Sequence, residues 1–175
     1  AALNAFKNIR KDGIIAINIT DGNDLIQVIL TDGERQVCLI SREGQCVHCD
    51  EQDIRPIGRD ATGVRGITLA EGDYVVSLTA VDPEARLLVV SEKGLGKRTE
   101  FDAYRKTKRG AKGVTTMNIT EKTGKVVAAL AVHTEDELML MASDGQSVRI
   151  KVDTIRETGR NAQGVKLMTL DGDIT

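Results

Sequence analysis

The chain has 175 residues, enough for one ordinary domain, and carries 24 Lys and Arg against 26 Asp and Glu, a net charge of −2. This balance excludes a protein coated uniformly in positive charge. The longest apolar run, residues 126–132, is far shorter than the roughly 20 residues of a membrane-spanning helix, and no N-terminal segment resembles a signal peptide, so we expect a cytoplasmic location.

Glycines recur along the chain at a nearly fixed interval. One series, in steps of 50, 50 and 51 residues, consists of Gly13, Gly63, Gly113 and Gly164, and a second consists of Gly44, Gly94 and Gly145. A fixed period of this length predicts an array of one supersecondary unit. We expect a single domain over 1–175, with units at approximately 13–62, 63–112 and 113–163 and partial units at both ends.

Each unit contains four apolar segments with turns between them. The first alternates apolar and polar residues after a glycine of the first series, at 13–19, 63–69, 113–119 and 164–170. The second is more apolar, at 25–30, 74–81 and 126–132. The third is the most hydrophobic, at 37–40, 87–90 and 138–141, and the fourth returns at 47–50, 97–101 and 148–152. Period-two alternation predicts strands, and the glycine between the third and fourth segments predicts a tight hairpin.

Four short strands per unit, without a long segment of helical periodicity, predict an all-β, propeller-like fold. Three hairpins of the third and fourth segments are complete, so we expect a partial ring of about three four-stranded blades. The ends of such an arc should expose strand edges or apolar flanks, and through them the fragment should self-associate.

The residues that usually carry chemistry are poorly placed for it. Cys46 and Cys49 belong to a period-two segment and should point to opposite faces, so we expect small buried side chains and no metal site. The stretch Gly94-Leu-Gly-Lys-Arg-Thr lacks the spacing of a phosphate loop. Neither histidine nor tyrosine has the setting of a catalytic group, so we expect no catalytic site and no cofactor.

Basic residues recur at equivalent positions and form columns. These are Arg55, Arg105 and Arg156; Arg59, Arg109 and Arg160; His48, Arg98 and Arg149; and Arg65 with Lys166, interrupted by Thr115. Residues 93–112 add a local excess of eight basic over two acidic residues. Because equivalent residues lie at one height around a ring, the columns predict a curved track of positive charge suited to the phosphates of duplex DNA.

Two alternatives remain open from the residues alone. One is that the column of Arg59, Arg109 and Arg160 braces the turns through carbonyls or nearby acids, and the other is that the propeller is a protein-interaction scaffold. Lysines that do not recur in every unit favour contact with a polyanion. The predicted DNA-binding residues are Arg65, Lys97, Arg98, Arg105, Lys106, Lys108, Arg109, Lys112, Arg149 and Lys166.

Four segments carry a resemblance to a known family: Gly94-Leu-Gly-Lys-Arg-Thr and residues 54–66, 104–114 and 159–165. Through them essentially the whole chain resembles the C-terminal domain of the DNA gyrase A protein. The resemblance implies a six-bladed β-pinwheel whose blades exchange strands and whose basic rim wraps duplex DNA to support negative supercoiling. It also implies, as partners, the rest of gyrase A and gyrase B, in an ATP-dependent type II topoisomerase whose active sites lie in other domains.

By the order of its motifs the chain is similar to the last half of that pinwheel. The hallmark Gln-Arg-Arg-Gly-Gly-Lys-Gly box of the family is not in this sequence, and its nearest match is residues 106–113, where Arg109, Lys112 and Gly113 agree with it. We therefore expect that this piece alone binds DNA weakly and does not support supercoiling. The C-terminal domain of the corresponding protein of topoisomerase IV shares the blade and is the alternative family.

Overall fold

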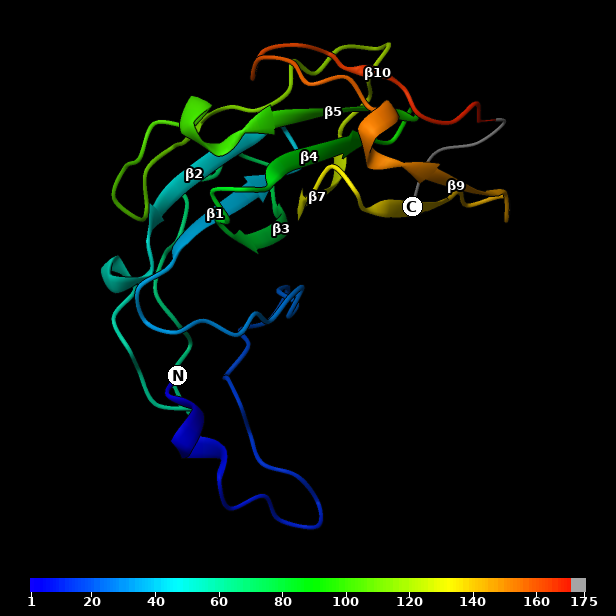
Figure 1. Ribbon diagram of the computed structural model, residues 1–175. Helices are drawn as coiled ribbons and strands as arrows, with labels where there is room; N and C mark the ends of the chain where they lie inside the picture. Colours follow the sequence, from blue (N-terminus) through cyan, green and yellow to red (C-terminus); the bar gives the residue numbers. More distant parts are fainter. Residues whose placement is uncertain (171–175) are drawn as a thin grey trace.

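The chain folds into three antiparallel sheets that lie side by side in an arc, with the N-terminal residues below the first sheet (Figure 1). A computed structural model describes residues 1–170, and the last five residues of the expected domain, 171–175, lie outside it. The strands are β1 Gln36–Ser41, β2 Gln45–Asp50, β3 Val75–Ala80, β4 Arg86–Ser91, β5 Leu95–Glu100, β6 Val114–Thr115, β7 Val126–Val132, β8 Glu137–Met141, β9 Ser147–Lys151 and β10 Val165–Lys166. The 3-10 turns are η1 Leu3–Phe6, η2 Glu51–Asp53, η3 Phe101–Ala103 and η4 Val152–Thr154.

The three predicted hairpins of the third and fourth segments form as β1–β2, β4–β5 and β8–β9. The reversal in each depends on a glycine of the second series. Gly94, for example, has φ +78, in the left-handed region that a residue without a Cβ enters at little cost. The all-β expectation is therefore confirmed, and the glycine period marks the hairpins.

The hairpins are completed by strands from later units. The first sheet has the order β3-β1-β2-β6 and the second the order β10-β5-β4-β7, so each combines a central hairpin with edge strands taken from the two following units. The strand exchange implied by the family resemblance is thus present. The boundaries of the sheets therefore do not coincide with those of the sequence units.

Several predicted strands pair less than expected. Segments 14–19, 25–30 and 64–69 are not strands, and of 114–119 and 165–170 only the first two residues of each pair. Ladder hydrogen bonds need a partner, and β6 and β10 find one at the glycine-turn ends of β2 and β5. Segments 14–19 and 25–30 have no partner strand among residues 1–170. The described residues therefore form two four-stranded sheets and one hairpin, where three four-stranded blades were expected.

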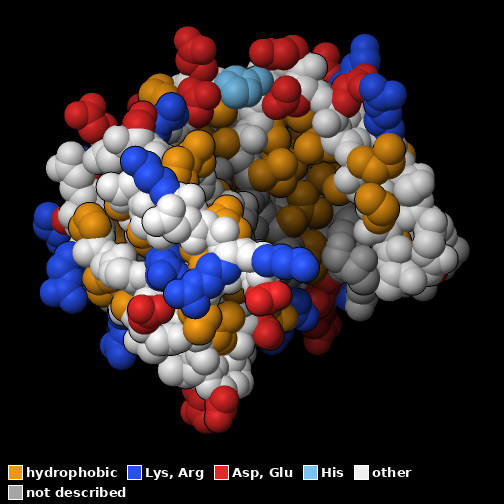
Figure 2. All heavy atoms as spheres, turned by 90° about the horizontal axis from the view of Figure 1, so that it is seen from below, with side chains coloured by type: hydrophobic (Ala, Val, Ile, Leu, Met, Phe, Trp, Pro, Cys, Tyr) orange, Lys and Arg blue, Asp and Glu red, His pale blue; other side chains and the backbone are white. Residues whose placement is uncertain are grey.

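Both ends of the arc expose apolar side chains, as expected for part of a ring. At the N-terminal end the exposed large apolar residues are Leu3, Ile9, Ile15, Ile17, Ile19, Leu25, Ile26, Val28 and Leu30. At the other end Met139 and Met141 of β8 are 58% and 60% exposed. Figure 2 shows hydrophobic side chains in a hollow on one face, with charged side chains around it. No helix formed by residues 1–170 has the length and apolar character to cross a membrane.

Two of the three core clusters formed by residues 1–170 lie between neighbouring sheets, and the third covers the other face of the first sheet. Strand β4 shows how the sequence encodes the burial between sheets. Leu87 and Val89 pack against residues of the first sheet, whereas Leu88 and Val90 pack with Leu140 beside the third. A strand buried on both faces needs apolar residues at every position, which explains the unbroken run from Leu87 to Val90. This two-sided burial stacks the sheets and fixes the segments that connect them.

Candidate nucleic-acid interface

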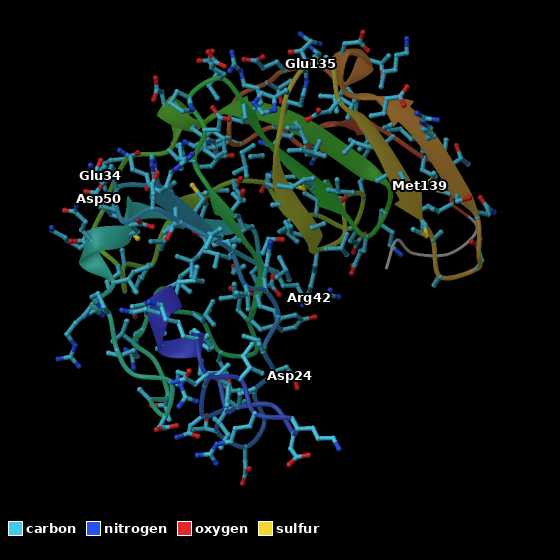
Figure 3. The ribbon with its side chains drawn as sticks, turned by 60° about the horizontal axis from the view of Figure 1, so that its bottom comes forward. Asp24, Glu34, Arg42, Asp50, Glu135 and Met139 are labelled. Atoms are coloured by element: carbon cyan, nitrogen blue, oxygen red, sulfur yellow. The ribbon has the colours of Figure 1, made fainter. Side chains whose placement is uncertain are left out.

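The basic columns lie on three equivalent connecting segments, 51–63, 101–113 and 152–164. Each starts with a 3-10 turn (η2, η3 or η4) and ends at a glycine of the first series. Figure 3 shows Asp50 and Arg42 at opposite ends of the first sheet, so segment 51–63 leaves from the end remote from the hairpin turn. The second and third segments then run beside β2 and β5, through parallel bridges from His48 to Lys106 and from Arg98 to Glu157.

Arg55, Arg105 and Arg156, called the rim arginines below, present their side chains to solvent. All three are exposed, and none has a side-chain hydrogen bond or ion pair with residues 1–170. Each follows an apolar residue that packs inward, namely Ile54, Tyr104 or Ile155. The same backbone therefore presents an unpaired guanidinium in each of the three segments.

The column of Arg59, Arg109 and Arg160 braces the fold, in line with the alternative considered from sequence. The guanidinium groups donate to the carbonyls of Ile15 (2.6 Å), Arg65 (3.1 Å) and Thr115 (3.0 Å), which are themselves 50 residues apart. Arg109 also donates to the carbonyl of Asp53, at 2.8 Å. Arg109 was among the expected DNA-binding residues, but its Nε and one terminal nitrogen bond main-chain carbonyls and tie it to the fold.

Lys97 and Arg98 differ more clearly from expectation, because neither reaches the surface. Lys97 is 0% exposed, and its Nζ donates to the carbonyls of Gly159 (2.7 Å) and Arg160. Arg98 is 8% exposed, and its Nε donates to the carbonyl of Ile155 at 2.8 Å. Segment 152–164 covers this part of β5, so the two charges join neighbouring parts of the fold and are not available to a phosphate.

The other expected residues are exposed, and they differ in whether the side chain has a partner. Lys106 pairs with Asp50 at 2.8 Å and Lys108 with Asp53 at 2.9 Å, and the Asp53 carboxylate raises the pKa of Lys108. Arg149 pairs with Glu137. Those exposed without a side-chain partner among residues 1–170 are Arg65, Arg105, Lys112 and Lys166.

Arg55 and Arg156 were missing from the expected set although they share a column with Arg105. Membership of that column was the signal that could have identified them, and the structure shows that all three members are exposed. The exposed cations on and beside the connecting segments that have no side-chain partner among residues 1–170 thus include Arg55, Arg65, Arg105, Lys112, Lys151, Arg156 and Lys166. Their repeated placement suits an extended polyanion better than a small anion.

The buried amine of Lys97 makes stability depend on pH. Burial and, to a smaller extent, the charge of Arg160 lower its pKa from 10.5 to about 8. Between these values the unfolded chain binds more protons than the folded one, so folding gains stability as the pH rises. Lys97→Met lacks this titrating amine. We therefore expect the free energy of unfolding of the parent, minus that of Lys97→Met, to rise by at most about 1.4 kcal/mol per pH unit above pH 8.

Urea unfolding of both proteins measures this difference. The pH values are about 7.5, 8.5 and 9.5, on either side of the lowered pKa of Lys97. A neutral amine keeps two N–H donors for the two carbonyls, so the bonds survive deprotonation. A difference that stays flat across this range would contradict a desolvated Lys97.

The cysteines behave as expected from their alternation. Cys46 packs in the cluster between the first and second sheets, whereas Cys49 packs on the opposite face with Val37 and Val47. The thiols of Cys38, Cys46 and Cys49 are free and buried, and burial raises the pKa of Cys49 to about 11. A thiol of this kind is a small core residue and a poor nucleophile at neutral pH.

Comparison with known proteins places the fold and the connecting segments in one family. The family model described as DNA gyrase C-terminal domain, beta-propeller, matches residues 2–32, 35–82, 85–133 and 136–173. The DNA gyrase A protein of Ureaplasma parvum is 40% identical over 98% of this chain, and that of Staphylococcus aureus is 41% identical over 99%. The chain spans about one fifth (20%) of the length of these relatives.

Solved structures agree with this assignment. A DNA gyrase A C-terminal domain superposes with a TM-score of 0.87 at 32% identity, covering 94% of this chain and 56% of the other. The C-terminal domain of a DNA topoisomerase IV superposes with a TM-score of 0.91 over 97% of this chain and 54% of the other, but at 24% identity it supports the fold alone. Because the family model matches nearly the whole length of this chain, the chain belongs to the DNA gyrase C-terminal domain family.

Proposed function

We propose that this chain binds duplex DNA along its connecting segments and wraps it, as part of the gyrase A protein of a DNA gyrase. The observation that carries the proposal is the column of rim arginines, which are exposed and unpaired at equivalent places in segments 51–63, 101–113 and 152–164. Arg65, Lys112 and Lys166 are also exposed without a side-chain partner among residues 1–170, and we include them in the proposed DNA-binding surface.

Repetition of cations suits a partner whose charges also repeat. Duplex DNA carries phosphates at regular intervals, and neutralising them releases condensed counterions, which gives affinity without reading the sequence. Arginine matches phosphate geometry through two parallel N–H donors, better than lysine does. Cations spread along an arc also favour bent duplex, since bending brings further phosphates into reach.

The family supplies the wider setting of the proposal. In it the chain assists negative supercoiling within a cytoplasmic, ATP-dependent type II topoisomerase, with the rest of gyrase A and gyrase B as partners and with the DNA-cleaving chemistry in other domains. Topoisomerase IV is less favoured, because the relatives at about 40% identity over nearly the whole chain are gyrase A proteins.

Titration of duplex DNA at several salt concentrations tests the proposal. We expect log K to fall linearly with log salt, by about 0.9 for each phosphate neutralised, and to differ little between DNA sequences. Fluorescence anisotropy with two unrelated duplexes of equal length measures both quantities. The scaffold alternative predicts no salt-dependent DNA binding, and that result would remove the proposal.

A further inference from the structure

Two buried residues of the third column, His48 and Arg98, hold the backbone next to a rim arginine. We call them the clamp residues. His48 Nδ1 donates to the carbonyl of Tyr104 at 2.8 Å, and Arg98 Nε donates to the carbonyl of Ile155 at 2.8 Å. Tyr104 and Ile155 immediately precede Arg105 and Arg156, so each clamp bond ends one residue before an exposed guanidinium.

The main chain of each clamp residue makes a second bond on the other side. The amide of Thr107 donates to the carbonyl of His48 at 2.7 Å, and the amide of Thr158 donates to the carbonyl of Arg98 at 2.9 Å. One clamp residue therefore holds the segment before and after the rim arginine, while the arginine side chain between these anchors stays in solvent. The anchoring residues Tyr104 and Ile155 are each 1% exposed.

The clamp is the feature that the two sites share, because the charges around them differ. Beside His48, Lys106 of the connecting segment pairs with Asp50 of the strand. Beside Arg98 the signs are reversed, since Arg86 of β4 pairs with Glu157 of the segment at 3.0 Å. Two different ion-pair arrangements around one shared geometry indicate that the hydrogen bonds of the clamp define the backbone.

We propose that His48 and Arg98 are positioning residues that hold Arg105 and Arg156 for contact with DNA phosphates, an inference that rests on the function proposed above. An arginine on a loose segment must lose backbone and side-chain freedom when it meets a phosphate, and a segment fixed beforehand avoids part of that cost. Arg149, the third member of the column, is exposed and pairs with Glu137, so it is not a clamp residue for residues 1–170.

A double-mutant cycle tests whether Arg98 acts through Arg156. In the full-length protein that contains this chain, Arg98→Met should weaken DNA binding about three- to tenfold, in the range of one lost phosphate contact. In an Arg156→Ala background it should have little further effect, because the residue it positions is gone. His48→Met should couple in the same way to Arg105→Ala, while the crossed pairs, His48 with Arg156 and Arg98 with Arg105, should be additive. Additive effects within a matched pair, or equal coupling in matched and crossed pairs, would overturn the proposal.

Hydrogen exchange gives a readout that does not depend on DNA. Arg98→Met should raise exchange in peptides covering 155–160 and leave 104–109 unchanged, and His48→Met should do the reverse. His48→Arg, which places the Arg98 side chain at the first site, should keep both protection and affinity. If the Met variants do not fold, Arg98→Lys and His48→Gln provide the same comparisons. A parent that fails to bind DNA refutes the proposed function, whereas normal binding with unchanged exchange refutes the clamp.

Discussion

Replacing Arg55, Arg105 and Arg156 together with alanine should weaken binding of duplex DNA by roughly two orders of magnitude at low salt. Each of these side chains is exposed and has no partner among residues 1–170, so its loss removes a phosphate contact without disturbing a hydrogen bond of the fold. The slope of log K against log salt should fall by about 0.9 per arginine, or about 2.7 in total. Anisotropy titrations of parent and triple variant over a range of salt concentrations measure both effects.

A charge-matched control separates local contact from net charge. Lys7, Lys11 and Lys122 are also exposed and without side-chain partners among the described residues, and they lie outside the three connecting segments. Their triple alanine variant changes the net charge by the same amount and should keep most of the affinity and slope. Equal losses in the two triple variants would mean that binding follows overall charge and that the rim arginines have no special place.

The second large effect concerns the joint between β2 and β6. Gly113 has φ +86, and a Cβ added there would lie 2.7 Å from the carbonyl oxygen of Cys46 and 2.9 Å from its carbon. Both atoms are main chain within the first sheet, so the strand that Gly113 introduces cannot keep its pairing. We expect Gly113→Ala to lower the free energy of unfolding by about 3 kcal/mol, measured by urea denaturation.

Gly72 provides the matched control for this substitution. It has φ +76, but a Cβ there would have nothing within 4 Å, so Gly72→Ala costs only the backbone strain, about 1 kcal/mol. The difference between the two variants isolates the close approach at Cys46. If both substitutions cost the same, the approach of segment 113–115 to the first sheet is looser than the structure shows.

The sequence predicted the hairpins well because their signals are local. A glycine able to adopt positive φ, between an apolar strand and a returning strand, specifies β1–β2 or β4–β5 without knowledge of anything distant. The edge strands were predicted less well, since a segment such as 64–69 becomes a strand only where another strand offers a ladder. Alternation alone does not say which strand that is.

The candidate interface was predicted in outline but not residue by residue. Repetition identified the columns, yet period-two alternation does not tell which face of β5 a later segment will cover, so Lys97 and Arg98 were expected at the surface. Their partners are main-chain carbonyls of Gly159 and Ile155, and a carbonyl has no residue identity that sequence could reveal. The sequence raised bracing by Arg109 as an alternative but did not decide it, for the same reason.

The sharing of strands between sequence units affects how the molecule unfolds and which units can be deleted. Each four-stranded sheet contains strands from three successive units, so deleting one unit also removes edge strands from neighbouring sheets. A destabilising change in one unit should therefore weaken its neighbours too. Repeats joined only by surface contact are able to melt one at a time. Sheets built from strands of several units should instead resist such stepwise unfolding, which would suit a domain that wraps DNA as proposed above.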